Sequence, residues 1–111
     1  MLQELPDNLR RTLDGMAREF HAAADAMLDP AVLSDHRRVR ALTAKRGALE
    51  PVVTRWDAWC AMEREARELE SIAAAGDSEL ADMARGELPG LRARAAAVMQ
   101  DLERRLVTSD D

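Results

Sequence analysis

The sequence predicts an all-α fold, an antiparallel three-helix bundle that contains a long helical hairpin with kinked helices. Alanine, leucine, arginine and glutamate dominate the 111 residues, and all four favour helix. Apolar residues recur at alternating steps of three and four, which is the helical period. Strand formers are scarce, with 3% aromatic residues and no tyrosine. The pattern covers about residues 7–27, 35–75 and 78–107, and the length suits a single domain over residues 1–111.

The first expected helix covers about residues 7–27. Pro6 suits a helix start, and Asp7 interacts favourably with the positive end of the helix dipole. The apolar stripe consists of Leu9, Leu13, Met16, Phe20, Ala23 and Met27. Asp29-Pro30 ends the helix, because a residue before proline is pushed out of the α region. The loop over residues 28–33 is short, so the next helix should turn back against the first.

The second expected helix covers about residues 35–75, with Ser34 as its N-cap and Gly76 at its C-terminal end. Pro51 lies inside it and clashes with the carbonyl of Gly47, which costs ~3 kcal/mol in a straight helix. No turn residues lie nearby, so we expect a kink there. The stripe Val39, Leu42, Leu49, Val53 and Trp56 passes through this point, and Trp59, Ala66, Leu69 and Ala73 extend an adjacent face.

The third expected helix covers about residues 78–107 and begins near Asp77 or Ser78. Its stripe is Leu80, Ala84, Leu88, Leu91, Ala95, Val98, Leu102 and Leu106. Gly86 and Pro89 predict a second kink within it. We expect Phe20, Trp56, Leu91 and Val98 to be mostly buried.

Composition excludes several classes of function. The net charge of -5 gives no electrostatic case for free nucleic acid as a partner. The N-terminal residues lack the pattern of a signal peptide, and no stretch has the ~20 apolar residues that span a bilayer. The single cysteine, Cys60, cannot form an intrachain disulfide. We therefore expect a cytoplasmic protein without membrane contact.

The residues give little support for catalysis. His21 and His36 do not form a metal pair, and zinc sites need three or four ligands. Several carboxylates lie four residues from an arginine, such as Glu63 with Arg67 and Asp101 with Arg105, and such pairs are ordinary on helix surfaces. Phosphate-binding glycine loops and a framed serine nucleophile are absent from the sequence. We expect no enzyme activity, no catalytic residue, no metal and no cofactor.

One local charge bias stands out in the second helix. It consists of Arg37, Arg38, Arg40, Lys45 and Arg46, against which only Asp35 and Glu50 stand between residues 35 and 50. These five are the candidate interaction residues, for an RNA backbone or for an acidic protein. The alternative is an ordinary exposed helix face, which the lack of interleaved aromatic residues favours. Trp56 and Trp59 could similarly form an interface, but core packing is the better interpretation.

The order and spacing of three short motifs resemble those of a known family. The motifs are Asp29-Pro30-Ala31-Val32-Leu33-Ser34-Asp35, then Leu49-Glu50-Pro51, then Glu79-Leu80 through Met83-Ala84. This layout resembles the N-terminal helical domain of bacterial class I peptide chain release factors over nearly the whole chain. The loop over residues 29–35 is more similar to type 1, which reads UAA and UAG, than to type 2. The resemblance implies an accessory domain in translation termination. It also implies the ribosomal stalk base and the release-factor GTPase as partners.

The sequence departs from this family in two respects. Gly86-Glu87-Leu88-Pro89-Gly90 stands where family members carry an acidic helical run. The codon-reading tripeptide and the catalytic Gly-Gly-Gln loop do not occur in this chain, so we expect no peptide release from it. A stand-alone helical adaptor for another protein remains the alternative function, and the oligomeric state stays open.

Overall fold

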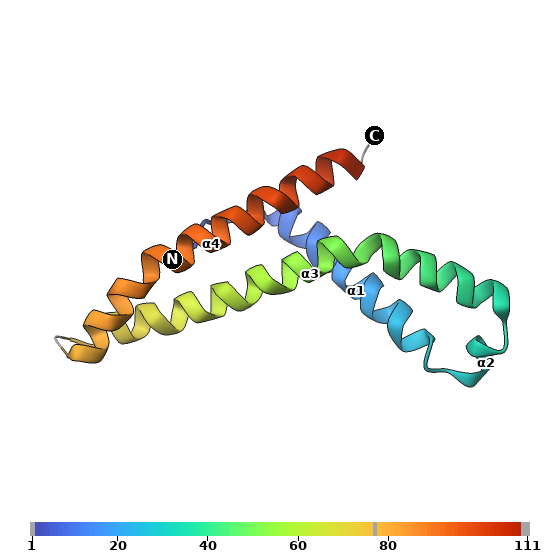
Figure 1. The fold of residues 1–111 in the computed structure, drawn as a ribbon, viewed down its shortest axis with the longest axis horizontal. Coiled ribbons are helices and arrows are strands. Elements are labelled where there is room, and N and C mark those ends of the chain that lie inside the picture. Colours follow the sequence, from blue (N-terminus) through green and yellow to red (C-terminus); the bar gives the residue numbers. More distant parts are fainter. Residues whose placement is uncertain (1, 77, 110–111) are drawn as a thin grey trace. The chain divides into compact units, whose positions relative to one another are not determined.

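The computed structural model describes residues 2–76 and 78–109, which form four helices and no strand (Figure 1). The helices are α1 (Asp7–Ala26), α2 (Pro30–Leu33), α3 (His36–Ala73) and α4 (Glu79–Ser109). The all-α prediction is therefore confirmed. The three long helices lie within one or two residues of the predicted bounds, as is usual for helix ends.

The chain divides into two compact units, residues 5–54 and residues 1–4 with 55–111. The long helix α3 contributes its first half to one unit and its second half to the other. In the unit of residues 5–54, α1 and the first half of α3 run antiparallel and are joined through α2 (Figure 1). Its buried residues include Leu13 and Ala23 of α1, Val32 of α2, and Val52 and Val53 of α3.

The α1–α3 connection contains a short helix that the sequence pattern did not predict. Asp29 has an extended backbone, as expected before Pro30, and its side chain accepts a hydrogen bond from the Ala31 N–H at 2.9 Å. Pro30 occupies the first helical position, where its missing N–H costs nothing. Val32, which is 3% exposed, anchors this helix. Residues 28–33 are therefore a capped helical turn and not an irregular loop.

The N-cap of α3 is Asp35 and not Ser34, so that prediction was wrong by one residue. The Asp35 carboxylate accepts from the Arg38 N–H at 3.2 Å, which satisfies a first-turn donor of α3. The Ser34 hydroxyl instead donates to the Ala31 carbonyl at 2.9 Å and so closes α2. Ser34 and Asp35 are both good capping residues, and the presence of α2 assigns each to a different helix.

In the unit that contains residues 55–111, the second half of α3 and α4 form an antiparallel hairpin (Figure 1). Its core is built around Trp56 and Trp59, whose rings stack with centroids 5.4 Å apart and planes 7° from parallel. Both rings are buried, so the core interpretation of the two tryptophans is confirmed. The remaining buried residues along the hairpin are Ala66, Ala81, Ala84, Leu88, Leu91, Ala95, Met99 and Leu102. The many small alanines let the two helices approach closely.

The buried stripe of α4 differs from the prediction towards both ends of the helix. Leu80 is 60% exposed and Ala81 is buried in its place, while Met99 is buried and Val98 is only half-buried. The Ser78 hydroxyl accepts from the Ala81 N–H at 3.1 Å and caps the first turn, as predicted. Asp77, the other predicted start, lies outside the described residues. Phe20 is also half-buried, so of the four residues expected in the core only Trp56 and Leu91 are fully enclosed.

Both internal prolines are accommodated within continuous helix. α3 runs through Pro51 and α4 runs through Pro89. Gly76 follows α3 with a φ of 121°, a left-handed conformation that glycine adopts without strain. The predicted helix continuity is therefore confirmed, and the axis bends at the two prolines stay predictions.

Candidate interaction surface

Four of the five candidate interaction residues lie on one exposed side of α3. Arg37, Arg38, Arg40 and Lys45 are all exposed, and we call them the basic band. At 3.6 residues per turn, these four positions span about 160° of the helix circumference. They form one surface that a partner could contact from a single direction.

Arg46 points to the other side of the helix and packs within its own unit. Its guanidinium carbon lies 5.6 Å from the centroid of the Phe20 ring, within the range of a cation–π contact. Its Nη1 donates to the Met27 sulfur at 3.9 Å, and its buried Nε has no hydrogen-bond partner among the described residues. Arg46 thus joins α3 to α1, and a partner would find its guanidinium already engaged.

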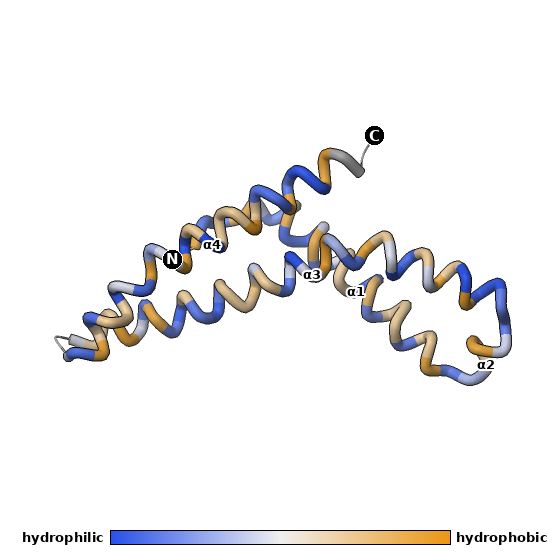
Figure 2. Tube along the Cα trace, in the orientation of Figure 1, coloured by the Kyte–Doolittle hydropathy of each residue, from blue (hydrophilic) through white to orange (hydrophobic). Residues whose placement is uncertain are grey.

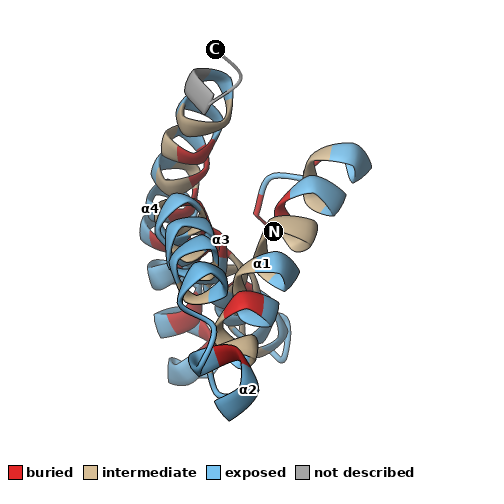
Figure 3. Cartoon of the chain, turned by 90° about the vertical axis from the view of Figure 1, so that its right-hand side faces the viewer, coloured by how far each residue is buried: buried red, intermediate tan, exposed pale blue. Residues whose placement is uncertain are grey.

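The basic band adjoins an exposed apolar corner that sequence reasoning missed. Leu28 is 78% exposed and Leu33 is 49% exposed, one on each side of the buried Val32. Val32 is the buried residue of α2 and the rest of this short helix is exposed (Figure 3), and in Figure 2 the apolar part of α2 is followed by the hydrophilic start of α3. We call residues 28–35 the α2 corner. Its only acidic side chains are Asp29 and Asp35, and each of them caps a helix.

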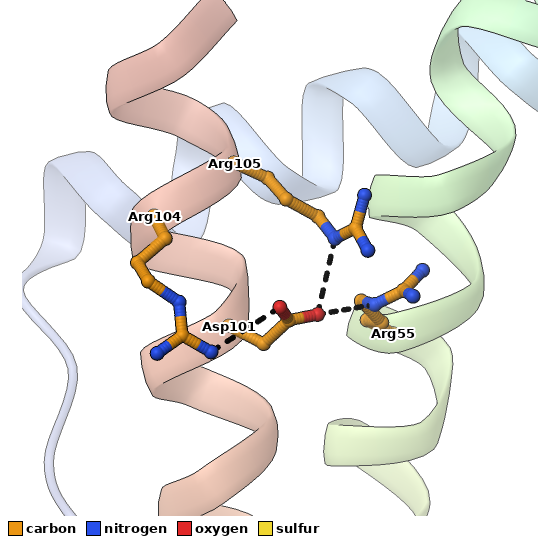
Figure 4. A network of polar contacts seen from close by, with 4 residues as sticks. All are labelled: Arg55, Asp101, Arg104 and Arg105. Carbon is orange, nitrogen blue, oxygen red and sulfur yellow. Dashed lines mark hydrogen bonds and ion pairs between the residues drawn. The ribbon is translucent and has the colours of Figure 1, made fainter.

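A second polar cluster, between α3 and α4, is centred on Asp101 (Figure 4). Its carboxylate accepts from the Arg105 Nε at 3.0 Å, from the Arg104 Nη2 at 3.4 Å, and from the Arg55 Nε. The Arg105 hydrogen bond is the main reason that the pKa of Asp101 falls from 3.8 to about 2. The hydrogen bonds from Arg55 and Arg104 act in the same direction, and partial burial opposes them. The sequence predicted only the pair with Arg105, because Arg55 comes from another helix.

The Asp101 cluster stabilises the packing of α3 against α4. It joins α3 to α4 by one carboxylate whose two oxygens already accept three guanidinium hydrogen bonds. The predicted pair of Glu63 and Arg67 is also present, at 3.9 Å on the surface of α3. These ion pairs stabilise helices and their packing, and they present no reactive group.

The unit that contains residues 55–111 also has a shallow hollow of about 390 Å³. Its lining consists of Glu65, Leu69, Gly86, Glu87, Gly90, Leu91 and Arg94. The hollow arises where two glycines of α4 have no side chain. Its carboxylates, Glu65 and Glu87, are both exposed, so the hollow lacks the buried environment that general acid–base catalysis requires.

Within residues 2–76 and 78–109, no three or more histidine, cysteine or acidic side chains are grouped to hold a metal ion. Over the same ranges, no helix has the length and apolar character to cross a membrane.

The family of the chain follows from a sequence comparison. Residues 16–111 match the PCRF domain, which is most of the chain and includes the α2 corner and the basic band. The chain therefore belongs to the PCRF-domain family of peptide chain release factors, whose work is translation termination and whose partners are ribosome-related. No solved structure matches it.

Proposed function

We propose that this chain acts as the accessory N-terminal domain of a bacterial class I release factor. In this role it docks near the ribosomal stalk base and on the release-factor GTPase, in the cytoplasm, and neither reads the stop codon nor hydrolyses peptidyl-tRNA. The observation that carries the proposal is the PCRF-domain match over residues 16–111. The assignment to type 1 rests on the loop motif of residues 29–35 alone.

The basic band gives this role a physical basis. Four exposed cations on one helix side steer association with an acidic surface and raise the association rate more than the final affinity. A slim helical surface of this size would bury less than ~1,200 Å², which is typical of transient contacts. We therefore expect weak binding that is sensitive to salt.

Cosedimentation with ribosomes and a pull-down with the GTPase test the proposal. Both are measured at low salt and again at raised salt, for the original chain and for the variant Arg37→Glu, Arg38→Glu, Lys45→Glu. We expect the variant to lose most of the low-salt binding, because reversed charges repel an acidic partner. Arg92→Glu with Arg94→Glu, on exposed positions of α4, is the matched control and should bind nearly normally.

The outcome also separates the two candidate functions. Binding to the ribosome or to the GTPase that depends on the basic band supports the release-factor role. An intact helical fold without binding to either partner would instead favour the stand-alone adaptor.

A further inference from the structure

We propose that the α2 corner and the basic band together recognise an acidic protein segment that carries apolar side chains, and not an RNA backbone. This inference deepens the proposed function, on which it rests, by naming the chemistry of the partner.

Two exposed leucines precede the basic band in the sequence. Single exposed leucines are ordinary on protein surfaces. Leu28 and Leu33 differ because Leu28 precedes the short helix α2, Leu33 is its last residue, and both lie within ten residues of Arg37. A sugar–phosphate backbone offers positioning contacts to cations but little apolar surface for leucine. In a protein segment that carries both kinds of group, carboxylates can pair with the basic band and apolar side chains can pack on the two leucines.

The α2 corner is held in one conformation before a partner binds. Three local hydrogen bonds fix the α2 corner, from Ala31 N–H to Asp29, from Ser34 to the Ala31 carbonyl, and from Arg38 N–H to Asp35. The buried Val32 holds the turn onto its unit. The two leucines are therefore presented in one arrangement before a partner arrives, which lowers the entropy cost of binding.

The local charge around the basic band is opposite in sign to the net charge of the whole chain. Over residues 28–45, four cations stand against two carboxylates, a net of +2, whereas the whole chain carries -5. Screening limits interactions at physiological salt to about 8 Å, so a short acidic segment responds mainly to the local positive charge. Surfaces that bind single-stranded RNA moreover stack bases on aromatic side chains, and residues 28–45 contain no phenylalanine, tyrosine or tryptophan and a single histidine, His36.

Fluorescence anisotropy with the full chain tests the inference, using three labelled probes. The first is a short amphipathic peptide of glutamate and leucine, the second is the same peptide with serine in place of leucine, and the third is a short single-stranded RNA. We expect the glutamate–leucine peptide to bind at least about tenfold more tightly than either other probe, a difference of about 1.4 kcal/mol.

Variants then assign the binding to this surface. Leu28→Ser with Leu33→Ser should weaken the glutamate–leucine peptide by about tenfold, and Arg37→Glu with Arg38→Glu should abolish its binding. Leu80→Ser with Met83→Ser is the matched control, because these residues are as exposed but lie beside Glu79 and Asp82. That control should bind the peptide normally. Circular dichroism verifies that each variant stays helical.

The inference is overturned if RNA binds as tightly as the glutamate–leucine peptide, or if the serine peptide binds equally well. It is also overturned if the leucine variant binds like the original chain. Failure of ribosome and GTPase binding with peptide binding intact would overturn the proposed function and leave the inference standing.

Discussion

Asp101 converts a charge pattern along α4 into a tertiary interaction. Two of its arginine partners, Arg104 and Arg105, are on its own helix, and the third, Arg55, is on α3. Because its pKa falls to about 2 from 3.8, the folded state binds fewer protons than the unfolded state between these values. This contribution to stability is present above the unfolded pKa and is lost as the pH falls through the folded pKa.

We therefore expect Asp101→Asn to lower the melting temperature at neutral pH. The variant should also lose part of the decline in melting temperature between about pH 4 and pH 2. Thermal unfolding followed by circular dichroism across this range measures both effects. Asp57→Asn, at an exposed position of α3, is the control and should keep the original pH profile. An unchanged pH profile in Asp101→Asn would show that the carboxylate is not stabilised in the folded state.

Arg46, one of the five candidate interaction residues, provides a second test because its guanidinium packs on the Phe20 ring. Arg46→Ala should lower the free energy of unfolding by about 1 kcal/mol, through loss of the cation–π contact and of the packed side-chain stem. Chemical denaturation of this variant is compared with that of Arg40→Ala. Arg40 is exposed, so its removal should change stability by less than about 0.5 kcal/mol. Equal effects of the two substitutions would contradict a packing role for Arg46.

Two residues within α4, Gly86 and Pro89, lower the stability of this helix. A Cβ added at Gly86 would meet no atom within 4 Å, so Gly86→Ala should raise the free energy of unfolding by about 1 kcal/mol. Pro89 is exposed within continuous helix, and Pro89→Ala should add about 2 kcal/mol, because it restores a backbone donor and removes a clash. Denaturant titration measures both.

Gly76→Ala is the matched counterpart of these substitutions. Its φ of 121° disfavours any side chain although the space around it is open. This variant should therefore be less stable by about 1 kcal/mol. If Gly86→Ala and Gly76→Ala changed stability in the same direction, helix propensity would not explain the result.

The sequence predicted the long helices well because their apolar periodicity extends over many turns. It could not predict α2, since four residues are too few to show a period. Ser34 and Asp35 are adjacent and equally suitable as the N-cap of α3, and the sequence does not show that Ser34 closes α2. At the ends of α4, alanine and methionine were buried at Ala81 and Met99, where the pattern favoured Leu80 and Val98. Which of two adjacent positions faces α3 is decided by tertiary packing.

The candidate surface was only partly predictable for the same reason. The cations of the basic band are visible as a local charge bias in the sequence. The engagement of Arg46 with Phe20 joins residues of two helices, so no local pattern contains it. The exposure of Leu28 and Leu33 depends on Val32 taking the buried position of α2. A pattern that buries the larger apolar side chains would have predicted that Leu28 and Leu33 are buried and that Val32 is exposed.

Charge is unevenly distributed along the whole chain. Residues 5–54 hold eight lysine and arginine residues against seven acidic ones, whereas residues 1–4 and 55–111 hold eight against fourteen. The resulting charges are +1 and -6, which sum to the formal -5. Binding to an acidic partner therefore depends on a local surface, and the chain as a whole would repel polyanions.

The residues of this chain predict that it does not catalyse peptide release. Gly-Gly-Gln does not occur in these 111 residues, and the hollow lined by Glu65 and Glu87 leaves both carboxylates exposed. We expect this polypeptide to release no peptide from ribosomes programmed with UAA, UAG or UGA. Release of labelled peptide from such complexes is the measurement, with a complete release factor as the positive control.

An added excess of this chain should also affect the complete factor in a defined way. If both use the same docking surface, the excess chain should compete with the complete factor for binding to the ribosome and to the GTPase. The variant Arg37→Glu, Arg38→Glu, Lys45→Glu should not compete, because its reversed charges prevent docking. Stop-codon-dependent release by the isolated chain would contradict the absence of catalysis. Competition that survives charge reversal would instead move the docking surface away from the basic band.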